Sequence, residues 1–581
     1  MSKFVDGIIG HAIGDAMGVP TEFCFRKKLL EKPITSMIGY GSHDVPAGTW
    51  SDDTSMSIAL IDSIINKNAI DYNDIMHNFY DWLHDAKYTA VGEVFDAGRT
   101  CIQAIINYSK GYEPLECGLK DSHNNGNGSL MRILPIAFYC YYKKLNSNEI
   151  IELCNNISSL THAHEISRLG CYIYVRFAIN LLEGLSIESA YAFMQKDDYS
   201  KFSEDALEKY NRILKKQIKE YQIDDINSSG YVVDTLEAAF WILMNSKNYQ
   251  ECIIASTNIG QDTDTIGAVV GGLAGIVYGV NSIPKSWLDK LIKKDYLIEL
   301  SLNFEKTLCD FNKDVLLGAI IGDVAGSRFE IVNNKYGKNF ELFNKNCRFT
   351  DDTVMTLAVA KALFEAKKDF SDIKDRCIES MVEVGRKYPK CGYGQKFYQW
   401  IMSDKHEPYE SFGNGSAMRI GPVGVVSNKN EEIIKLADII TNVSHNHIDS
   451  IKGSEAVCVA INMALNGKTK SDIKDYIEQN YFIISDLKEN EMKPKIFHIN
   501  CVETVKQSMQ AFLDSYDFED AIRNAIALGG DSDTIAAITG SLASAFYGIP
   551  SEYYIKVKEY LDDYLLNIYY NFNERFGKNE I

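Results

Sequence analysis

One set of short motifs occurs twice in this chain, in the same order, and this repeat limits the possible folds more than any other feature. The first copy contains Gly14-Asp15-Ala16-Met17-Gly18 and the second contains Gly322-Asp323-Val324-Ala325-Gly326, with slightly shorter intervals between the later motifs. Length alone suggests about three or four domains, but the repeat predicts two similar ones. We expect the boundary in the segment 301–314, and assign residues 1–305 to the first domain and 306–581 to the second.

The pattern of apolar residues predicts helices in both copies. Residues at i, i+3, i+4 and i+7 are apolar in the segments 55–65, 234–245, 353–366 and 534–548. Alternating strand patterns are scarce, and only 11 prolines interrupt the chain. We therefore predict an all-α fold of two tandem domains.

Four glycines lie inside one predicted helix, at Gly267, Gly271, Gly272 and Gly275. A glycine in a helix interior costs about 1 kcal/mol relative to alanine. We interpret them as sites of close backbone packing in a central helix, in preference to a ligand-binding role.

Two acidic strings in each copy carry the main chemical information. Ser51-Asp52-Asp53-Thr54 matches Thr350-Asp351-Asp352-Thr353, and Gly260-Gln261-Asp262-Thr263-Asp264-Thr265 matches Gly529-Gly530-Asp531-Ser532-Asp533-Thr534. Each string begins a predicted helix, so any one of them could simply complement the helix dipole. Matched pairs of strings favour another interpretation, because clustered carboxylates and hydroxyls are hard oxygen ligands that suit two divalent cations.

A glycine-rich string is also repeated. Gly126-Asn127-Gly128-Ser129-Leu130-Met131-Arg132 matches Gly413-Asn414-Gly415-Ser416-Ala417-Met418-Arg419. A tight turn is the default interpretation of one such string, but its recurrence favours a loop whose amides face pyrophosphate or ribose hydroxyls. The arginines could pair with phosphate or could support the acidic cluster by salt bridges.

Two further repeats involve histidine and glutamate. Thr161-His162-Ala163-His164 matches Ser444-His445-Asn446-His447. No cysteine or third histidine is repeated beside them, which argues against zinc and favours ligand contact or a structural hydrogen bond. Glu22 and Glu330 each follow the Asp of the first motif by seven residues; each could close over a site or be a solvated loop residue.

Charge and cysteine content restrict the partners and the compartment. The formal net charge is −19 with no basic stretch, which argues against nucleic acid as the main partner. The 13 cysteines are scattered without a C-x-x-C motif, which is typical of free thiols in a reducing compartment. We find no secretory signal and no bilayer-spanning stretch, and we expect a cytoplasmic protein.

The five motifs together resemble the ADP-ribosylglycohydrolase family, also called ADP-ribosyl hydrolases or dinitrogenase-reductase-activating-glycohydrolase-like proteins. The resemblance covers nearly the whole chain and occurs in both halves. It implies an orthogonal all-α bundle in each half, with two Mg²⁺ (or Mn²⁺) ions per domain held in a cleft.

The resemblance also implies roles for individual residues. The metal ligands would be Ser51, Asp52, Asp53, Asp262, Asp264 and Thr265 in the first half, and Thr350, Asp351, Asp352, Asp531, Asp533 and Thr534 in the second. The catalytic residues would be Asp52, Asp53, Glu22, Asp351, Asp352 and Glu330. ADP-ribose would be bound by Gly126, Asn127, Gly128, Ser129, His162, Gly413, Asn414, Gly415, Ser416 and His445.

The implied reaction is hydrolysis of the bond between the distal ribose of ADP-ribose and a modified side chain. The partner would be an ADP-ribosylated protein or a small ADP-ribose conjugate. Residues 92–100 resemble those of arginine-directed and nitrogenase-reductase-directed members, whereas residues 392–398 resemble another bacterial branch. We therefore predict two working sites with unlike leaving groups, the first directed at arginine. Gln261 replaces a glycine usual at that position.

Three alternatives for the function and one question about the domains remain open at this stage. One half could be catalytic and the other only bind ADP-ribose, or the substrate could be a small conjugate such as O-acetyl-ADP-ribose. Some family members have lost catalysis altogether, although both halves here keep every repeated Asp. The two halves could also pair with each other within the chain, because no low-complexity linker separates them.

Overall fold

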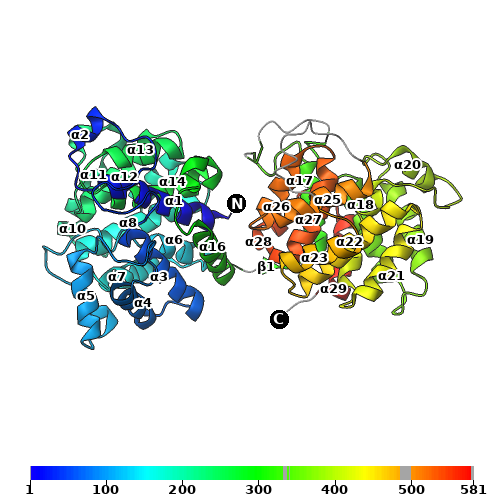
Figure 1. The fold of residues 1–581 in the computed structure, drawn as a ribbon, viewed down its shortest axis with the longest axis horizontal. Helices are drawn as coiled ribbons and strands as arrows, with labels where there is room; N and C mark the ends of the chain where they lie inside the picture. The colour runs from blue at the N-terminus through cyan, green and yellow to red at the C-terminus, as the bar shows by residue number, and fades with distance from the viewer. Residues whose placement is uncertain (1, 310, 331–336, 339, 485–498, 578–581) are drawn as a thin grey trace. The chain divides into compact units, whose positions relative to one another are not determined.

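The computed structural model describes residues 2–309, 311–330, 337–338, 340–484 and 499–577. The chain divides into two compact units (Figure 1), unit 1 (Met1–Cys309) and unit 2 (Asp310–Ile581). Each unit has its own hydrophobic core. The predicted all-α class is confirmed. Within the described ranges the strands are β1 (Phe311–Asn312) and β2 (Ile549–Pro550), which form one short antiparallel pair in unit 2.

The helices of unit 1 surround a central pair, α1 and α14. In chain order they are α1 (Lys3–Gly18), α2 (Arg26–Glu31), α3 (Asp52–Lys67), α4 (Tyr72–Asp85), α5 (Arg99–Ser109), α6 (Leu134–Tyr142), α7 (Ser147–Ser159), α8 (Glu165–Leu182), α9 (Ile187–Gln195), α10 (Glu204–Lys209), α11 (Asn211–Lys215), α12 (Val232–Asn245), α13 (Tyr249–Asn258), α14 (Thr263–Tyr278), α15 (Lys285–Leu288) and α16 (Lys294–Leu308).

Unit 2 repeats this arrangement around α17 and α27. Its helices are α17 (Val315–Gly326), α18 (Asp351–Glu365), α19 (Ile373–Lys387), α20 (Gln395–Met402), α21 (Asn430–Thr441), α22 (Ile448–Leu465), α23 (Lys470–Asn480), α25 (Cys501–Leu513), α26 (Phe518–Leu528), α27 (Ser532–Tyr547), α28 (Ser551–Val557) and α29 (Asp563–Phe576). All four segments with helical apolar spacing lie in helices, namely α3, α12, α18 and α27.

Glycine allows the two central helices of unit 1 to touch backbone to backbone. A Cβ on Gly14 of α1 would overlap the carbonyl of Gly267 of α14, and a Cβ on Gly267 would overlap the carbonyl of Gly14. In unit 2 a Cβ on Gly322 of α17 would overlap the carbonyl of Ala536 of α27. The structural interpretation of the helix glycines is confirmed, and this contact sets the start of α14 beside the end of α1.

A buried aspartate on each central helix positions the start of a second helix. Asp15 on α1 accepts hydrogen bonds from the backbone N–H groups of Ser51 (2.9 Å) and Thr54 (3.1 Å), at the start of α3. Asp323 on α17 does the same for Thr350 (2.8 Å) and Thr353 (3.0 Å). The Asp of the first repeated motif therefore satisfies backbone donors that a helix leaves free at its N-terminus.

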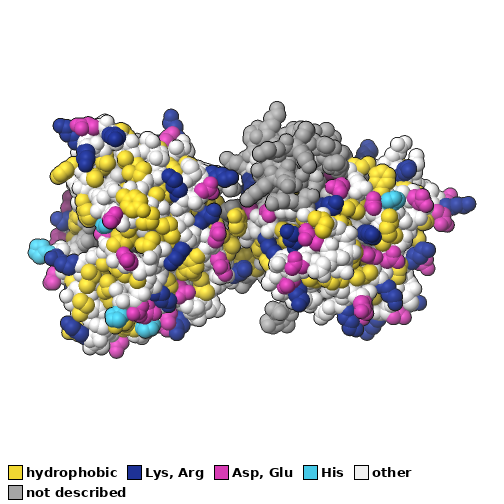
Figure 2. All heavy atoms as spheres, in the orientation of Figure 1, with side chains coloured by type: hydrophobic (Ala, Val, Ile, Leu, Met, Phe, Trp, Pro, Cys, Tyr) yellow, Lys and Arg dark blue, Asp and Glu magenta, His cyan; other side chains and the backbone are white. Residues whose placement is uncertain are grey.

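Helix character and surface charge both restrict the interactions of the chain. Among the described residues, no helix combines the length and the apolar character that crossing a membrane would require. On the face drawn in Figure 2, basic and acidic side chains are interspersed over the described part of each unit.

Candidate active site

In unit 1 the two acidic strings meet at the N-termini of α3 and α14. Ser51 is the N-cap of α3, and its hydroxyl donates a hydrogen bond to Asp53 Oδ2 (2.9 Å). Thr265 Oγ1, from the first turn of α14, donates to the same oxygen (3.4 Å). Oxygens of Glu22, Asp262 and Asp264 all lie within 4.8 Å of one another. Residues more than 200 positions apart therefore form one cluster.

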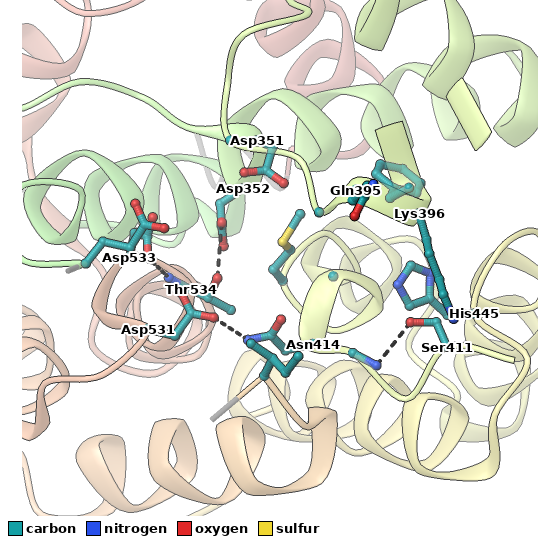
Figure 3. Close-up of a pocket in the computed structure, with 18 of the residues that line it drawn as sticks. Asp351, Asp352, Gln395, Lys396, Ser411, Asn414, His445, Asp531, Asp533 and Thr534 are labelled. Atoms are coloured by element: carbon teal, nitrogen blue, oxygen red, sulfur yellow. Dashed lines mark hydrogen bonds between the residues drawn. The ribbon is translucent and has the colours of Figure 1, made fainter. Parts of the chain in front are cut away.

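Unit 2 builds the same cluster at α18 and α27, as Figure 3 shows. Thr534 Oγ1 donates a hydrogen bond to Asp352 Oδ2 (3.2 Å), and the N-cap hydroxyl of Thr350 donates to the same atom (3.4 Å). Two sets of carboxylates each fit within 4.8 Å, and both include Asp533. These sets are Asp323, Asp352 and Asp533, and Glu330, Asp531 and Asp533.

Burial and mutual repulsion raise the pKa of these carboxyl groups. Burial, followed by neighbouring carboxylates, raises the pKa of Asp53 and Asp264 well above the ordinary value. The same causes raise the pKa of Glu22 to about 10 and that of Asp351 to about 8. In the described part of the chain, no lysine or arginine forms an ion pair with the acidic strings. A bound divalent cation would therefore stabilise the ionised form of the cluster.

The unpartnered oxygens give a direct test of whether a metal fits. Asp53 Oδ1, Asp264 Oδ2 and Asp352 Oδ1 are buried and have no hydrogen-bond partner. A buried carboxylate oxygen without a partner carries a high free-energy cost. Because the donors are hard oxygen atoms, the residues fit divalent cations such as Mg²⁺ or Mn²⁺.

The glycine-rich loops are joined directly to the acidic clusters. Asn127 Nδ2 donates hydrogen bonds to Asp262 Oδ2 (2.7 Å) and Thr235 Oγ1 (2.9 Å). Asn414 Nδ2 donates to Asp531 Oδ2 (2.6 Å) and to a matching threonine on α25 (3.2 Å). The Asn of this motif thus fixes one oxygen of a candidate metal ligand.

The repeated arginines take a role that neither sequence interpretation anticipated. Arg132 is fully buried and donates hydrogen bonds to the Gly128 carbonyl and to Thr161 Oγ1 (2.8 Å). Arg419 is equally buried and donates to Ser444 Oγ (2.8 Å). These arginines hold the residue before the histidine and, in unit 1, also the glycine-rich loop. Among the described residues neither arginine forms an ion pair with the acidic strings, and the phosphate interpretation stays a prediction.

The two histidines of each His-x-His string divide their roles. His162 and His445 face the glycine-rich loops, and a Cβ on Gly128 would lie 2.9 Å from the ring of His162. Burial lowers the pKa of His162 to about 3. His164 and His447 instead accept the N-cap hydrogen bonds of α8 and α22 (3.2 Å each). The first histidine is therefore available to a ligand as a neutral ring, and the second is structural.

A cavity opens beside each cluster, with a volume of about 210 Å³ in unit 1 and about 430 Å³ in unit 2. Its lining includes Glu22, Asp52, Gly126, Asn127, Gly128, His162, Asp262 and Thr265 in unit 1, and Glu330, Asp351, Asp352, Gly413, Asn414, Gly415, His445, Asp531, Asp533 and Thr534 in unit 2.

Some expected site residues do not line these cavities. Ser51, Asp53, Asp264 and Thr350 are buried behind the lining residues, within the acidic clusters. The serines of the glycine-rich loops are a separate case. Ser129 is fully buried and accepts a hydrogen bond from Ser158 (3.0 Å), and Ser416 is equally buried. Their hydroxyls point into the protein, so the expectation that these two side chains contact ADP-ribose is not supported by their position.

Comparison with known proteins assigns the chain to a family. The sequence profile of the ADP-ribosylglycohydrolase family matches residues 1–312 and, a second time, residues 305–578. The chain belongs to the ADP-ribosylglycohydrolase family. It contains two tandem copies of the family's fold, as the sequence resemblance implied.

Individual ADP-ribosylglycohydrolases resemble about half of the chain each. An ADP-ribosylarginine hydrolase, Tri1, of Serratia proteamaculans (strain 568) is 31% identical over 52% of this chain and 78% of its own. The ADP-ribosyl-[dinitrogen reductase] glycohydrolase of Rhodospirillum rubrum is 29% identical over 50% of this chain and 91% of its own. A solved chain of an ADP-ribosylglycohydrolase-related protein complex has 25% identity and a TM-score of 0.45, covering 52% of this chain and 97% of its own.

Several residues near the sites of this ADP-ribosylglycohydrolase were missed by sequence reasoning. Asp323 belongs to an acidic set, and its repetition in the G-D-x-x-G motif was the available signal. His43 Nε2 lies 2.5 Å from Glu22 Oε2, and both residues lie near Asp96. His43 has no repeated counterpart that would have identified it. Asp96 lies in the segment 92–100, which resembles that of arginine-directed and nitrogenase-reductase-directed members.

Gln261 forms a turn beside the first site. It adopts a positive φ of 62°, which glycine would adopt more easily. Its backbone carbonyl accepts from Phe23 N (2.7 Å), and its N–H donates to the Cys24 carbonyl (2.8 Å). The turn therefore holds the segment that follows Glu22, and Glu22 itself is only 4% exposed.

Proposed function

We propose that both units hydrolyse the glycosidic bond between ADP-ribose and a modified group, and that unit 1 acts on the arginine linkage. One observation supports this most directly. In each unit, two acidic strings and a glycine-rich loop from distant parts of the sequence meet at one cavity, joined by the Asn127–Asp262 and Asn414–Asp531 hydrogen bonds. An ADP-ribosylarginine hydrolase is among the relatives that match about half of the chain.

The residues that would hold metal are those of the acidic clusters. We assign two Mg²⁺ ions, or Mn²⁺ ions, to each unit, because unit 2 has two sets of carboxylates that share Asp533. Such ions would supply positive charge toward the ribose hydroxyls and toward water. The ligands would be Ser51, Asp52, Asp53, Asp262, Asp264 and Thr265 in unit 1 and Thr350, Asp351, Asp352, Asp531, Asp533 and Thr534 in unit 2.

The protein groups would act on substrate and water around these clusters. The backbone of the glycine-rich loop and the neutral His162 ring would bind ADP-ribose. A carboxylate on the cavity wall, Asp52 or Glu22 in unit 1 and Asp351 or Glu330 in unit 2, would take a proton from water. The water oxygen bonds to the anomeric carbon, the bond to the modified group breaks, and the leaving nitrogen or oxygen gains a proton.

A reducing, cytoplasmic location accompanies this function. All thirteen cysteines are free, and most are buried. Unpaired cysteines at this density are typical of a compartment that keeps thiols reduced. The substrates would be ADP-ribosylated proteins or small ADP-ribose conjugates.

The test is release of ADP-ribose by the full chain. We expect activity with Mg²⁺ and loss of activity with EDTA. Asp53→Ala and Asp352→Ala should each cause a partial loss of activity. Asp53→Asn and Asp352→Asn repeat the test with side chains of nearly unchanged volume. Activity that survives EDTA would refute the metal assignment. If only one substitution reduces turnover, one unit is a binding module rather than an enzyme.

A further inference from the structure

The two cavities differ at one corresponding segment. Helices α5 and α20 each begin after an extended glycine, Gly98 (φ −61°) and Gly394 (φ −57°). Two residues earlier, Asp96 (φ 52°) and Gly392 (φ 112°) both have positive φ. This shared backbone conformation aligns Asp96 with Gly392. It also aligns Arg99 with Gln395 and Thr100 with Lys396, and all six residues line their cavities.

Unit 1 presents carboxylates and aromatic rings on this side. Asp96 lies with Glu22 and His43 in a set whose ligand atoms are within 4.8 Å of one another. The ring of His43 is 5.1 Å from that of Phe95 and 6.0 Å from that of Phe23, which is 69% exposed. Carboxylates and aromatic faces are the groups that recognise a planar guanidinium.

At the corresponding positions, unit 2 has a glycine in place of the carboxylate and a lysine in place of the threonine. Gly392 has no side chain, and a Cβ there would lie 2.9 Å from Asp351 Oδ1. Figure 3 shows Lys396 extending from α20 along the wall that carries His445, on the other side of the cavity from Asp531 and Asp533. A guanidinium leaving group would meet a like charge here, which is unfavourable in a partly enclosed cavity.

From this contrast we propose that unit 2 hydrolyses oxygen-linked ADP-ribose conjugates, with a neutral or anionic leaving group, and that Lys396 determines this specificity. The inference rests on the proposed function. The bond between the anomeric carbon and the leaving oxygen breaks, the water oxygen takes its place, and one water proton is transferred to the leaving oxygen. Lys396 donates hydrogen bonds to an oxygen-bearing leaving group and disfavours a cationic one.

The charge of the neighbouring residues supports the same assignment. Arg99 also lines the cavity of unit 1, but Asp96 offsets its charge, and Thr100 adds none. Gly392, Gln395 and Lys396 together carry one positive charge. At these three positions the net charge therefore changes from neutral to cationic between units, and only unit 1 has a carboxylate there.

The experiment uses the full chain with one unit inactivated at a time. Asp53→Ala leaves unit 2 active, and Asp352→Ala leaves unit 1 active. Each is given two peptides, one ADP-ribosylated on arginine and one on serine, and kcat/KM is measured for both. We expect unit 1 to prefer the arginine linkage and unit 2 the serine linkage. Lys396→Thr should lower the serine preference of unit 2 by about tenfold, and Thr100→Lys should lower the arginine preference of unit 1 by about tenfold.

A conservative variant separates charge from shape. Lys396→Arg keeps the cation and should retain the preference ratio of unit 2. Equal preferences in the two units, or a ratio that Lys396→Thr leaves unchanged, would overturn the specificity assignment while leaving the hydrolase function intact. Failure of the wild-type chain to cleave either peptide would overturn the proposed function itself.

Discussion

Asn127 Nδ2 donates a hydrogen bond to Asp262 Oδ2 at 2.7 Å, and this bond joins the glycine-rich loop of unit 1 to its acidic cluster. The corresponding bond in unit 2, from Asn414 to Asp531, measures 2.6 Å. Groups that orient a metal ligand typically contribute 10- to 100-fold to affinity or activity. The loop and the cluster therefore form one functional assembly in each unit.

Removal of this amide should weaken only the unit that contains it. In a chain whose unit 2 is inactivated by Asp352→Ala, we expect Asn127→Ala to lower kcat/KM by about 10- to 100-fold and to weaken Mg²⁺ binding. Asn414→Ala in the same background is the matched control and should leave the activity of unit 1 unchanged. An equal loss from both substitutions would contradict the independence of the two sites.

Removal of one carboxylate from the acidic cluster should raise the stability of the metal-free protein but reduce the stabilisation by Mg²⁺. Burial, followed by neighbouring carboxylates, raises the pKa of Asp264 well above the ordinary value, so Asp264→Asn should stabilise the metal-free protein by removing both costs. Each 1 kcal/mol so gained raises Tm by about 2–4 °C for a domain of this size. With Mg²⁺ the same variant should show a smaller rise in Tm than wild type. Differential scanning calorimetry with and without EDTA measures both effects, and a variant less stable than wild type in EDTA would contradict the repulsion.

The stability of the metal-free protein should fall as pH rises. Burial raises the pKa of Asp15 to about 7 and that of Asp351 to about 8. Because the folded protein holds these protons more tightly than the unfolded chain, their contribution is full below about pH 4 and is lost as pH rises through 7 and 8. A bound cation displaces the protons, so the Tm increase caused by Mg²⁺ should grow from pH 5.5 to pH 8. A constant increase over this range would argue against coupled proton release.

The glycines of the central helices should stabilise each unit because they allow two helix backbones to touch. Gly322→Ala places a Cβ against the Ala536 carbonyl. It should lower the Tm of unit 2 by several degrees or prevent its folding. Gly394→Ala is the control, because a Cβ there meets nothing within 4 Å and its φ is −57°. Thermal unfolding followed by circular dichroism compares the two. Similar losses from both variants would contradict the close approach of α17 and α27.

His43 should act by holding Glu22 in place. Its Nε2 atom lies 2.5 Å from Glu22 Oε2. In the Asp352→Ala chain we expect His43→Ala to lower kcat by about tenfold, and His43→Gln, which keeps a donor, to restore part of the loss. The exposed His77→Ala serves as a control and should have no effect. Full activity of His43→Ala would show that Glu22 needs no such support.

The sequence predicted that the acidic strings begin helices, because a helix start has a local signature. Ser51 caps a helix and Asp262 starts another, and the repeat showed that these strings belong together. The long-range partners could not be predicted. Arg132 donates hydrogen bonds to the Gly128 carbonyl and to Thr161. The second of these bonds depends on how α7 packs against the glycine-rich loop.

The sequence alone shows only that the segments 92–100 and 392–398 differ between the two units. Asp96 and Gly392 lie in strings with little sequence similarity, and their equivalence depends on shared positive φ angles. Local sequence does not determine which side chain faces a cavity when the segment is a loop. The role of His43 likewise depends on a loop that brings it beside Glu22.

The most direct test is to count the bound cations by isothermal titration with Mn²⁺. We expect about four ions per chain in wild type and about two in each of the double variants Asp53→Ala/Asp264→Ala and Asp352→Ala/Asp533→Ala. Thermal unfolding confirms that the variants are folded. A wild-type chain that binds no Mn²⁺, or variants that bind as many ions as wild type, would show that the acidic strings do not form the metal sites.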